Sequence, residues 1–226
     1  MTKELILETH NKIEFEPQAH TYYYNNKYLT SGTEFISQYH KPFNTEEILK
    51  KLYQDPKQRA YKRYEWANSS TWGTYIHELL EMHYNGEEIH TNEVEFLFGI
   101  NRVEEFLRKG YEIVGTEIRV TNGEIAGTID LLLQDPITKT FLLLDFKTCQ
   151  KLDKMTYRDE RFYSPLEDVE YNKFNKYSLQ LSLYASILED NYGVDVEDMF
   201  LIWINKENKG VTWRCEDLRE EIRRVL

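Results

Sequence analysis

The chain has 226 residues, of which 41% are hydrophobic and 30% are charged, a composition typical of one soluble domain or of one core with an added subdomain. No apolar run is long enough to cross a bilayer, and the first residues lack the apolar stretch of a secretory signal, so we expect a cytoplasmic protein. Two cysteines, Cys149 and Cys215, cannot supply the four thiolates of an iron–sulfur cluster. We expect free thiols, with one disulfide as the alternative.

The formal net charge of −11 argues against a nucleic-acid partner, because phosphates attract cations. The charge is unevenly spread, however. Basic residues gather in two groups, the first being Lys50, Lys51, Lys57, Arg59, Lys62 and Arg63, and the second Lys147, Lys151, Lys154, Arg158 and Arg161. Acidic residues gather elsewhere, notably between Glu78 and Glu105. A basic groove on an acidic body would suit a nucleic acid, and solvated helix faces are the alternative.

The first 70 residues predict a β-hairpin followed by helices. The predicted elements are, in chain order, strands at 12–16 and 20–24, a tight turn at Asn25-Asn26, a short helix from Ser31, a helix capped by Asn44 or Thr45, and a successor helix that ends around 68–70. The helix capped near Asn44 and its successor carry the first basic group. We expect this part to form a cap that belongs to the same domain as the rest.

Residues 71–226 predict a core in which a helix precedes a three-stranded meander. The predicted elements are helices at 71–84 and 92–108, strands at 111–121, 124–134 and 140–147, a helix at 175–192, a strand at 199–204 that can pair with 211–214, and a terminal helix at 216–226. The apolar run from Phe141 to Leu144 is typical of a central strand that is covered on both faces. The fold class is therefore α/β or α+β.

The sequences Gly127-Thr128-Ile129-Asp130 and Asp145-Phe146-Lys147 lie on two adjacent predicted strands. Antiparallel neighbours are about 5 Å apart, so two carboxylates can face each other across the ladder. Together with a backbone carbonyl and waters they form the hard-oxygen site that Mg²⁺ or Mn²⁺ prefers. Lys147 is two residues after Asp145 and points to the same face, where it could orient a water or stabilise charge on a phosphate. A salt bridge between Asp145 and Lys147 is the alternative.

This pattern, with an upstream helix and a downstream helix, resembles the PD-(D/E)XK nucleases, and most closely their RecB-like exonuclease branch. Gly73-Thr74-Tyr75-Ile76-His77 is similar to the G-T-x-x-H helix of that branch, and Gln180-Leu181-Ser182-Leu183-Tyr184 is similar to its Q-x-x-x-Y helix. The predicted order of elements from 71 to 204 matches the αβββαβ core of the family. The resemblance implies a restriction-endonuclease-like core at 71–226, with a hairpin and helical cap at 1–70.

The resemblance also implies roles for single residues. One or two Mg²⁺ or Mn²⁺ ions would be held by His77, Asp130, Asp145 and the backbone carbonyl of Phe146, with Asp130, Asp145 and Lys147 as the catalytic set. Glu117, Gln180 and Tyr184 would support the site or contact DNA, and Glu81 could be a partner of His77. The basic residues that could bind DNA are Lys50, Lys51, Lys57, Arg59, Lys62, Arg63, Lys151 and Lys154.

We therefore expect a metal-dependent DNA exonuclease of phage or bacterial recombination or repair. It would act on single-stranded or duplex ends, alone or with a separate recombination, helicase or single-strand-binding protein, because no nucleotide-binding helicase motif is present. The alternatives are a restriction-like or structure-specific endonuclease and an inactive DNA- or protein-binding module. A zinc peptidase is disfavoured, because the second histidine of its motif would fall on Glu81.

Overall fold

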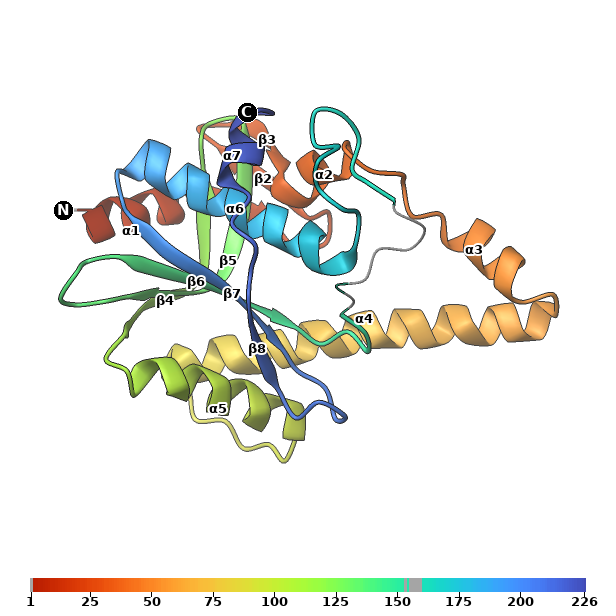
Figure 1. The fold of residues 1–226 in the computed structure, drawn as a ribbon. Coiled ribbons are helices and arrows are strands. Elements are labelled where there is room, and N and C mark those ends of the chain that lie inside the picture. Colours follow the sequence, from red (N-terminus) through yellow and green to blue (C-terminus); the bar gives the residue numbers. More distant parts are fainter. Residues whose placement is uncertain (1, 153, 155–159) are drawn as a thin grey trace.

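A computed structural model describes residues 2–152, 154 and 160–226. Its centre is a mixed eight-stranded sheet flanked by helices (Figure 1). The strands are β1 (Ile13–Glu16), β2 (Thr21–Tyr24), β3 (Lys27–Ser31), β4 (Glu112–Thr121), β5 (Ile125–Gln134), β6 (Phe141–Lys147), β7 (Val196–Trp203) and β8 (Val211–Arg214). The helices are α1 (Thr2–Lys12), α2 (Gly32–Ser37), α3 (Thr45–Leu52), α4 (Pro56–Tyr84), α5 (Val94–Leu107), α6 (Lys173–Tyr192) and α7 (Arg219–Arg223).

Strand β5 is the strand around which the sheet is organised. It pairs antiparallel with β4 along one edge. Its other edge is shared, because β3 pairs in parallel with Ile125 and Ala126, whereas β6 pairs antiparallel with residues 131–134. Residues 127–130 lie between these two pairings. Strand β7 continues the sheet in parallel beside β6, and β8 is antiparallel to β7.

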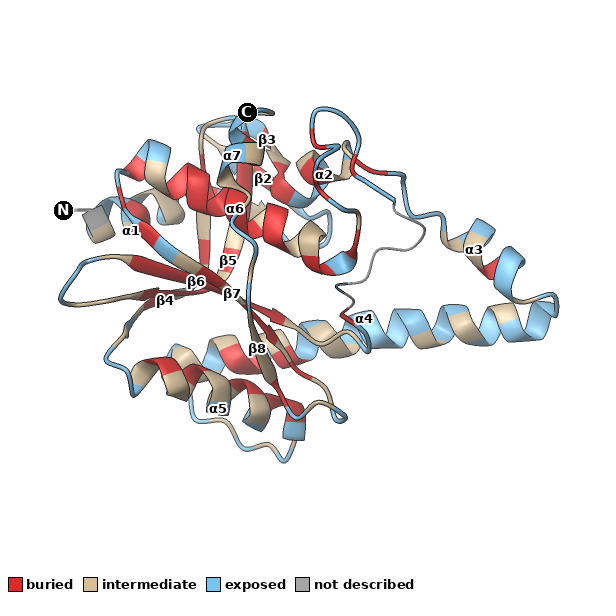
Figure 2. Cartoon of the chain, viewed as in Figure 1, coloured by how far each residue is buried: buried red, intermediate tan, exposed pale blue. Residues whose placement is uncertain are grey.

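Helices cover both faces of the sheet, so the chain has two hydrophobic clusters. On one face α6 packs through residues such as Leu183 and Ile187 against Ile129 and Leu143. On the other face α5 and the second half of α4 pack against Leu142, Leu144 and their neighbours. Figure 2 shows the buried residues on both sides of the sheet. Strand β6 is thereby covered on both faces, as its apolar sequence predicts.

Several local sequence signals form the structures that they predict. Asn25 and Asn26 both have positive φ, at 51° and 61°, as the tight turn of a right-twisted hairpin requires. The side chains of Ser31 and Asn44 accept from the backbone N–H groups of Glu34 and Glu47, and so cap α2 and α3. The predicted strand 211–214 is β8 and pairs with β7.

The structure differs from the sequence-based predictions at three helices. No element was predicted for the residues before 12, where α1 is present and buries Ile6 completely. The helix break expected around 68–70 is absent, because α4 runs without interruption from Pro56 to Tyr84. The hydroxyls of Ser69 and Thr71 donate to carbonyls four residues earlier, at 2.9 and 3.2 Å, which lets these residues stay helical.

The third is the terminal helix, which is shorter than the predicted 216–226. The backbone N–H groups of Glu216 and Leu218 donate to the hydroxyls of Ser178 and Ser182 on α6, at 3.2 and 3.0 Å. These contacts hold residues 216–218 outside a helix, so α7 begins only at Arg219.

The N-terminal part is joined to the remainder by both a helix and the sheet. The boundary expected between residues 70 and 71 lies within α4, and β3 pairs with β5. The division into a cap and a core therefore stays a prediction. None of the described helices combines the length and the apolar character that a membrane span needs.

Candidate active site

A pocket of about 470 Å³ opens between α4, β4–β6, α6 and the N-terminal hairpin. The residues expected to carry chemistry meet there. Its polar lining includes His77, Glu78, Glu81, Glu117, Thr128, Asp130, Asp145, Lys147, Gln180 and Tyr184. Along one edge of β5, β3 pairs with residues 125–126 and β6 pairs with residues 131–134. Among the described residues, the segment 127–130 between them has no paired strand on that edge, and the pocket opens there.

Asp130 is fixed by contacts from two other elements. Its Oδ2 accepts a 2.7 Å hydrogen bond from the backbone N–H of Phe146 on β6 and lies 3.4 Å from Nδ1 of His77 on α4. Helix α4 can approach the end of β6 this closely because residue 73 is glycine. A Cβ there would lie 2.7 Å from Oγ1 of Thr148, closer than real Cβ contacts.

Glu117 enters the site through an irregularity in β4. Its φ is +47°, in the left-handed region that few non-glycine residues adopt. Thr116 pairs with Leu131 and Ile118 with Ile129, which puts Glu117 opposite Asp130. Burial raises the pKa of Glu117 to about 9, and the charges of Asp130, Glu81 and Asp145 add to the effect. The fold thus holds the Glu117 carboxyl close to other acids, where its charged form is unfavourable unless a positive charge lies nearby.

His77, Glu117 and Asp130 form a group that fits a metal ion. Each offers one ligand atom, and these atoms all lie within 4.8 Å of one another. One imidazole nitrogen and two carboxylate oxygens suit a divalent cation such as Mn²⁺ or Mg²⁺. A cation among them would also relieve the crowding of acids that raises the pKa of Glu117.

Asp145 and Lys147 form a separate pair beside this group. Oδ2 of Asp145 makes an ion pair with the ammonium of Lys147, and Asp145 is only 3% exposed. The ammonium also lies 4.7 Å from the centre of the Tyr177 ring. Burial alone would lower the pKa of Lys147, but Asp145, Asp130 and Tyr177 outweigh it and raise the pKa above its usual value. Lys147 is therefore a fixed positive charge and a poor general base.

The metal ligands expected from the sequence are thus divided between two groups. Asp130 lies with His77 as expected, but its carboxylate neighbour in the described group is Glu117, where Asp145 was expected. Asp145 instead forms a salt bridge with Lys147, which was the alternative interpretation of the motif. The N–H of Phe146 contacts Asp130, and the metal-binding role of its carbonyl stays a prediction.

Gln180 and Tyr184 lie together at the pocket, as their spacing predicts. Nε2 of Gln180 donates to the hydroxyl of Tyr184 at 3.1 Å, and burial raises the pKa of Tyr184, which keeps it neutral. The Tyr184 ring lies against Gly127, where a Cβ would be 2.0 Å from Cε1, and against Gly32, where it would be 2.7 Å away. Tyr184 is 3% exposed, so it supports the wall of the pocket.

The first basic group lies on α3 and the first half of α4, which project from the body of the molecule (Figure 1). None of its members is among the residues that line the pocket. Several of its charges are already engaged. Arg63 pairs with Glu46 and Lys62 with Glu65, both at 2.5 Å, and Arg59 donates to two backbone carbonyls. The exposed members are Lys50, Lys51, Lys57 and Arg63.

The second basic group is dispersed. Lys147 lies in the site, whereas the ammonium of Lys154 lies 4.0 Å from the centre of the Phe174 ring. Arg161 donates to the carbonyl of Asp168 at 2.9 Å. Lys151 is exposed, and Arg158 lies outside the described residues.

Tyr22 and Thr128 are among the pocket residues that were missed from the sequence. The hydroxyls of Tyr22 on β2 and Thr128 on β5 are hydrogen-bonded at 2.9 Å, and both residues line the pocket. Thr128 could have been found, because it is two residues before Asp130 on one strand and shares its face. Tyr22 carries no such signal, because its place depends on a pairing between distant segments.

No protein-family model matches the chain, and no curated protein matches it. Among solved structures, one described as the crystal structure of SSO0001 aligns with 99% of this chain and 80% of its own at 16% identity, with a TM-score of 0.40. A likeness at this level carries no conclusion about family or activity.

Proposed function

We propose that the chain is a metal-dependent DNA nuclease of the PD-(D/E)XK superfamily, close to its RecB-like exonucleases, that hydrolyses phosphodiester bonds at DNA ends. One observation carries the proposal. A group of three candidate metal ligands, His77, Glu117 and Asp130, lies in the same pocket as the Lys147 ammonium, which Asp145 holds in place. Apart from α5, which lies between α4 and β4, the elements follow the order α4, β4, β5, β6, α6, β7, and this supports the proposal because the resemblance implies the order αβββαβ.

The donor set fits one or two Mg²⁺ or Mn²⁺ ions, held by His77, Glu117 and Asp130, with Asp145 close by. A bound ion would polarise the scissile phosphate and lower the pKa of a coordinated water. The N–H of Phe146 fixes the orientation of Asp130. Lys147, charged and held by Asp145, stabilises the negative charge that develops on the phosphate.

The remaining lining residues hold this arrangement and bound the substrate. Tyr184 closes the wall behind Gly127, and Gln180 donates to its hydroxyl. The Tyr22–Thr128 hydrogen bond ties the N-terminal hairpin to β5 beside Asp130. The hairpin therefore limits how a nucleic-acid strand can enter, which favours an exposed end over the middle of a duplex.

The test is cleavage of end-labelled linear DNA and of circular DNA with Mg²⁺, Mn²⁺ or EDTA. Metal-dependent degradation of linear DNA but not of circles is expected, and the fate of the label gives the polarity. Lys147→Ala should lower the rate by at least about 100-fold, since one preorganised charge is worth roughly that much, and leave DNA binding largely intact. Lys139→Ala is the matched control, because Lys139 is an exposed lysine near the opposite end of β6.

Each other outcome has a definite meaning. Cutting of circles would make the enzyme an endonuclease. Cleavage by Lys147→Ala at the wild-type rate would refute the mechanism. Binding without cleavage by the folded wild-type protein, with either metal, would replace the nuclease with a binding module.

A further inference from the structure

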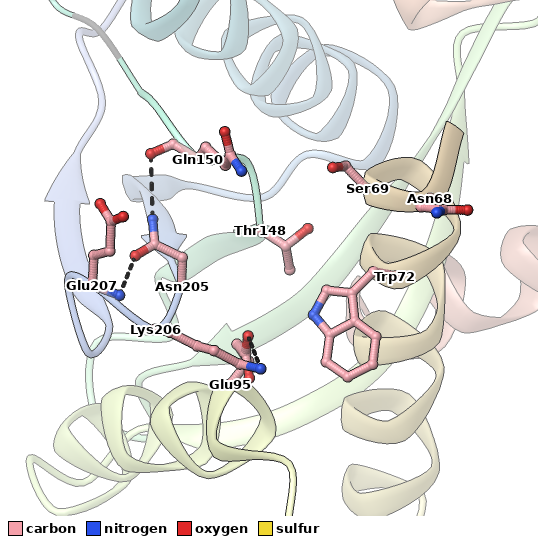
Figure 3. A pocket seen from close by; sticks show the side chains of 9 residues that line it. All are labelled: Asn68, Ser69, Trp72, Glu95, Thr148, Gln150, Asn205, Lys206 and Glu207. Carbon is pink, nitrogen blue, oxygen red and sulfur yellow. Dashed lines mark hydrogen bonds and ion pairs between the residues drawn. The ribbon is translucent and has the colours of Figure 1, made fainter. Parts of the chain in front are cut away.

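A second pocket, of about 410 Å³, lies beside the candidate active site (Figure 3). It is lined by side chains of α4, of the segment after β6, of α5 and of the loop between β7 and β8. Those that matter here are Trp72, Glu95, Thr148, Gln150, Asn205 and Lys206. None of them has a role in the mechanism above.

The two pockets are neighbours on the same two elements. On α4, Trp72 lines the second pocket and Gly73 lines the first; on the β6 side, Thr148 lines the second and Lys147 the first. The close approach of Gly73 and Thr148 is the wall between them. A chain molecule with its phosphate at Lys147 would have one of its neighbouring units on the side of the second pocket, because Thr148 directly follows Lys147.

The second pocket contains a buried carboxylate with unused hydrogen-bonding capacity. Glu95 is 5% exposed, and its Oε2 has no hydrogen-bond partner among the residues that the structure describes. Lys206 lies 3.9 Å from the other oxygen, Oε1, and its own side chain is 68% exposed. Figure 3 shows the Lys206 ammonium between Glu95 and the indole of Trp72, 5.7 Å from the centre of that ring. Such a loose contact leaves a buried charge short of donors.

The rest of the pocket is preorganised. Asn205 donates to the carbonyl of Gln150 at 3.5 Å and accepts from the N–H of Glu207 at 2.9 Å (Figure 3). These hydrogen bonds hold the loop between β7 and β8 in place and occupy both the N–H donor and the oxygen acceptor of the Asn205 side chain. The groups left for a ligand are thus an aromatic surface, from Trp72, and an acceptor, from Glu95, with the exposed Lys206 side chain beside them.

We propose that this pocket takes the base of the nucleotide next to the scissile phosphate, and prefers a base that carries an exocyclic amino group. A base stacks on an indole, and its N–H groups can donate to a carboxylate as cytosine does in groove recognition. Phosphate is disfavoured, because Glu95 and Glu207 would repel it, and a basic side chain is disfavoured, because the ammonium of Lys206 would repel it. A neutral base meets neither repulsion, and Lys206, whose side chain is 68% exposed, can move aside for it. The inference rests on the proposed nuclease function and adds that the strand is bound single-stranded at this point, because a paired base cannot enter.

The experiment is an abasic scan. Short single-stranded DNAs with one abasic site at successive positions from the end are bound to the protein with Ca²⁺ in place of Mg²⁺, and affinity is measured by fluorescence anisotropy. At one position the abasic site should weaken binding about tenfold, the size expected when one stacked base is removed. Trp72→Leu should bind unmodified DNA about tenfold more weakly and show no further weakening at that position.

Trp66→Leu is the matched control. Trp66 lies on the same helix but outside the pocket, with its ring 6.0 Å from that of Phe43, so this variant should keep the abasic penalty. A flat scan, or a penalty that persists in Trp72→Leu, would overturn the inference. Cleavage of unmodified DNA by the wild type with Mg²⁺ separates the two proposals: with cleavage and a flat scan, only the base pocket fails, and without binding or cleavage both fail.

The choice of base is tested at the position that the scan identifies. Adenine, cytosine or guanine there should bind more tightly than thymine, which has no amino group. Glu95→Gln, which keeps the shape and removes the charge, should reduce this preference while leaving the stacking contribution in place. An unchanged preference would remove Glu95 from the recognition of the base.

Discussion

At the scale of single residues, the candidate site is a set of acids held closer together than their charges favour. Glu117 has a left-handed backbone, and its pKa is raised to about 9, while burial raises the pKa of Asp145. Glu117, which faces other acids, lowers the stability of the metal-free protein and increases the affinity for a cation that relieves it, whereas Asp145 is compensated by Lys147. Function and stability therefore oppose each other at Glu117.

This opposition predicts how stability depends on pH without metal. Below about pH 4.5 both the folded and the unfolded chain hold the proton of Glu117; between about 4.5 and about 9 only the folded chain keeps it. The free energy of unfolding should therefore fall as pH rises through this window. Glu117→Gln should lack this part of the decline, so it should gain stability over the wild type at pH 8 and bind Mn²⁺ more weakly.

Urea unfolding in EDTA at several pH values, with calorimetric Mn²⁺ titration, checks this expectation. Glu112→Gln is the control, because Glu112 is an exposed acid on the same strand. Identical pH slopes for Glu117→Gln and the wild type would show that Glu117 does not hold its proton in the folded protein.

The Asp145–Lys147 pair predicts a second effect. Asp145→Asn leaves the Lys147 ammonium, 17% exposed, without its partner, and should destabilise the fold by about 3 kcal/mol, because an uncompensated buried charge is costly. Asp198→Asn removes an ion pair whose arginine, Arg214, is 70% exposed, and should lie within about 1 kcal/mol of the wild type. Chemical denaturation of both variants makes the comparison, and equal destabilisation would contradict the buried pairing.

At the scale of elements, the position of α6 against β5 depends on two glycines. The ring of Tyr184 fills the space that Cβ atoms on Gly32 and Gly127 would need. Gly127 is paired with Val120 in the sheet, and the Tyr184 ring is buried, so neither can readily withdraw. The family resemblance alone would assign Tyr184 to support or DNA contact, whereas this contact accounts for its burial by packing.

Gly127→Ala should therefore destabilise the protein by about 1–3 kcal/mol, the usual range for overpacking a filled core, and lower activity by shifting Asp130. Gly115→Ala on β4 is the control, because its Cβ would meet the terminal methyl of Ile118 at 2.8 Å, which can rotate away. Thermal melts together with cleavage rates test both. Equal stability of the two variants would mean that α6 can move away from β5 at little cost.

The elements also show how far sequence reasoning reaches. The caps at Ser31 and Asn44, the Asn25-Asn26 turn and the β4–β6 meander follow from local signals. The continuity of α4 does not, because Asn68-Ser69-Ser70 suits a helix end as well as a helix whose hydroxyls bond backwards. Likewise, the structure brings His77, Asp130 and Lys147 together in one pocket, as predicted. The direction of the Glu117 side chain could not be predicted, because its positive φ breaks the regular alternation of side chains along the strand.

At the scale of the whole molecule, an acidic chain must bind an acidic polymer if the proposal holds. Helix α3 and the first half of α4 project from the body and are largely exposed (Figures 1 and 2). Under the proposed function, their exposed lysines would contact the DNA backbone at a distance from the pocket. This is an electrostatic contribution, and it should depend on salt.

Lys50→Glu, Lys51→Glu and Lys57→Glu together should therefore weaken DNA binding and flatten its salt dependence, by about 0.9 in log–log slope for each phosphate that these lysines neutralise. The same charge change at the exposed residues Arg108, Lys109 and Lys139 should lower affinity much less. The first two directly follow α5 and the third lies between β5 and β6, elements that Figure 1 shows away from α3. Binding isotherms at several salt concentrations distinguish the two. Equal weakening in both triple variants would assign the effect to net charge alone.

The continuity of α4 has a mechanical consequence. Pro56 and His77 lie on one helix, and about 30 Å of helix separates them at roughly 1.5 Å per residue. The helix is anchored near its C-terminal end by the buried residues Ile76, Leu79 and Leu80, and His77 lies among them. If a DNA strand or a protein displaced the exposed N-terminal end of α4, the helix would pivot about this anchor, and the imidazole of His77 would rotate slightly. Under the proposed function, a substrate that binds at the far end of α4 would in this way alter the geometry of the candidate metal ligands.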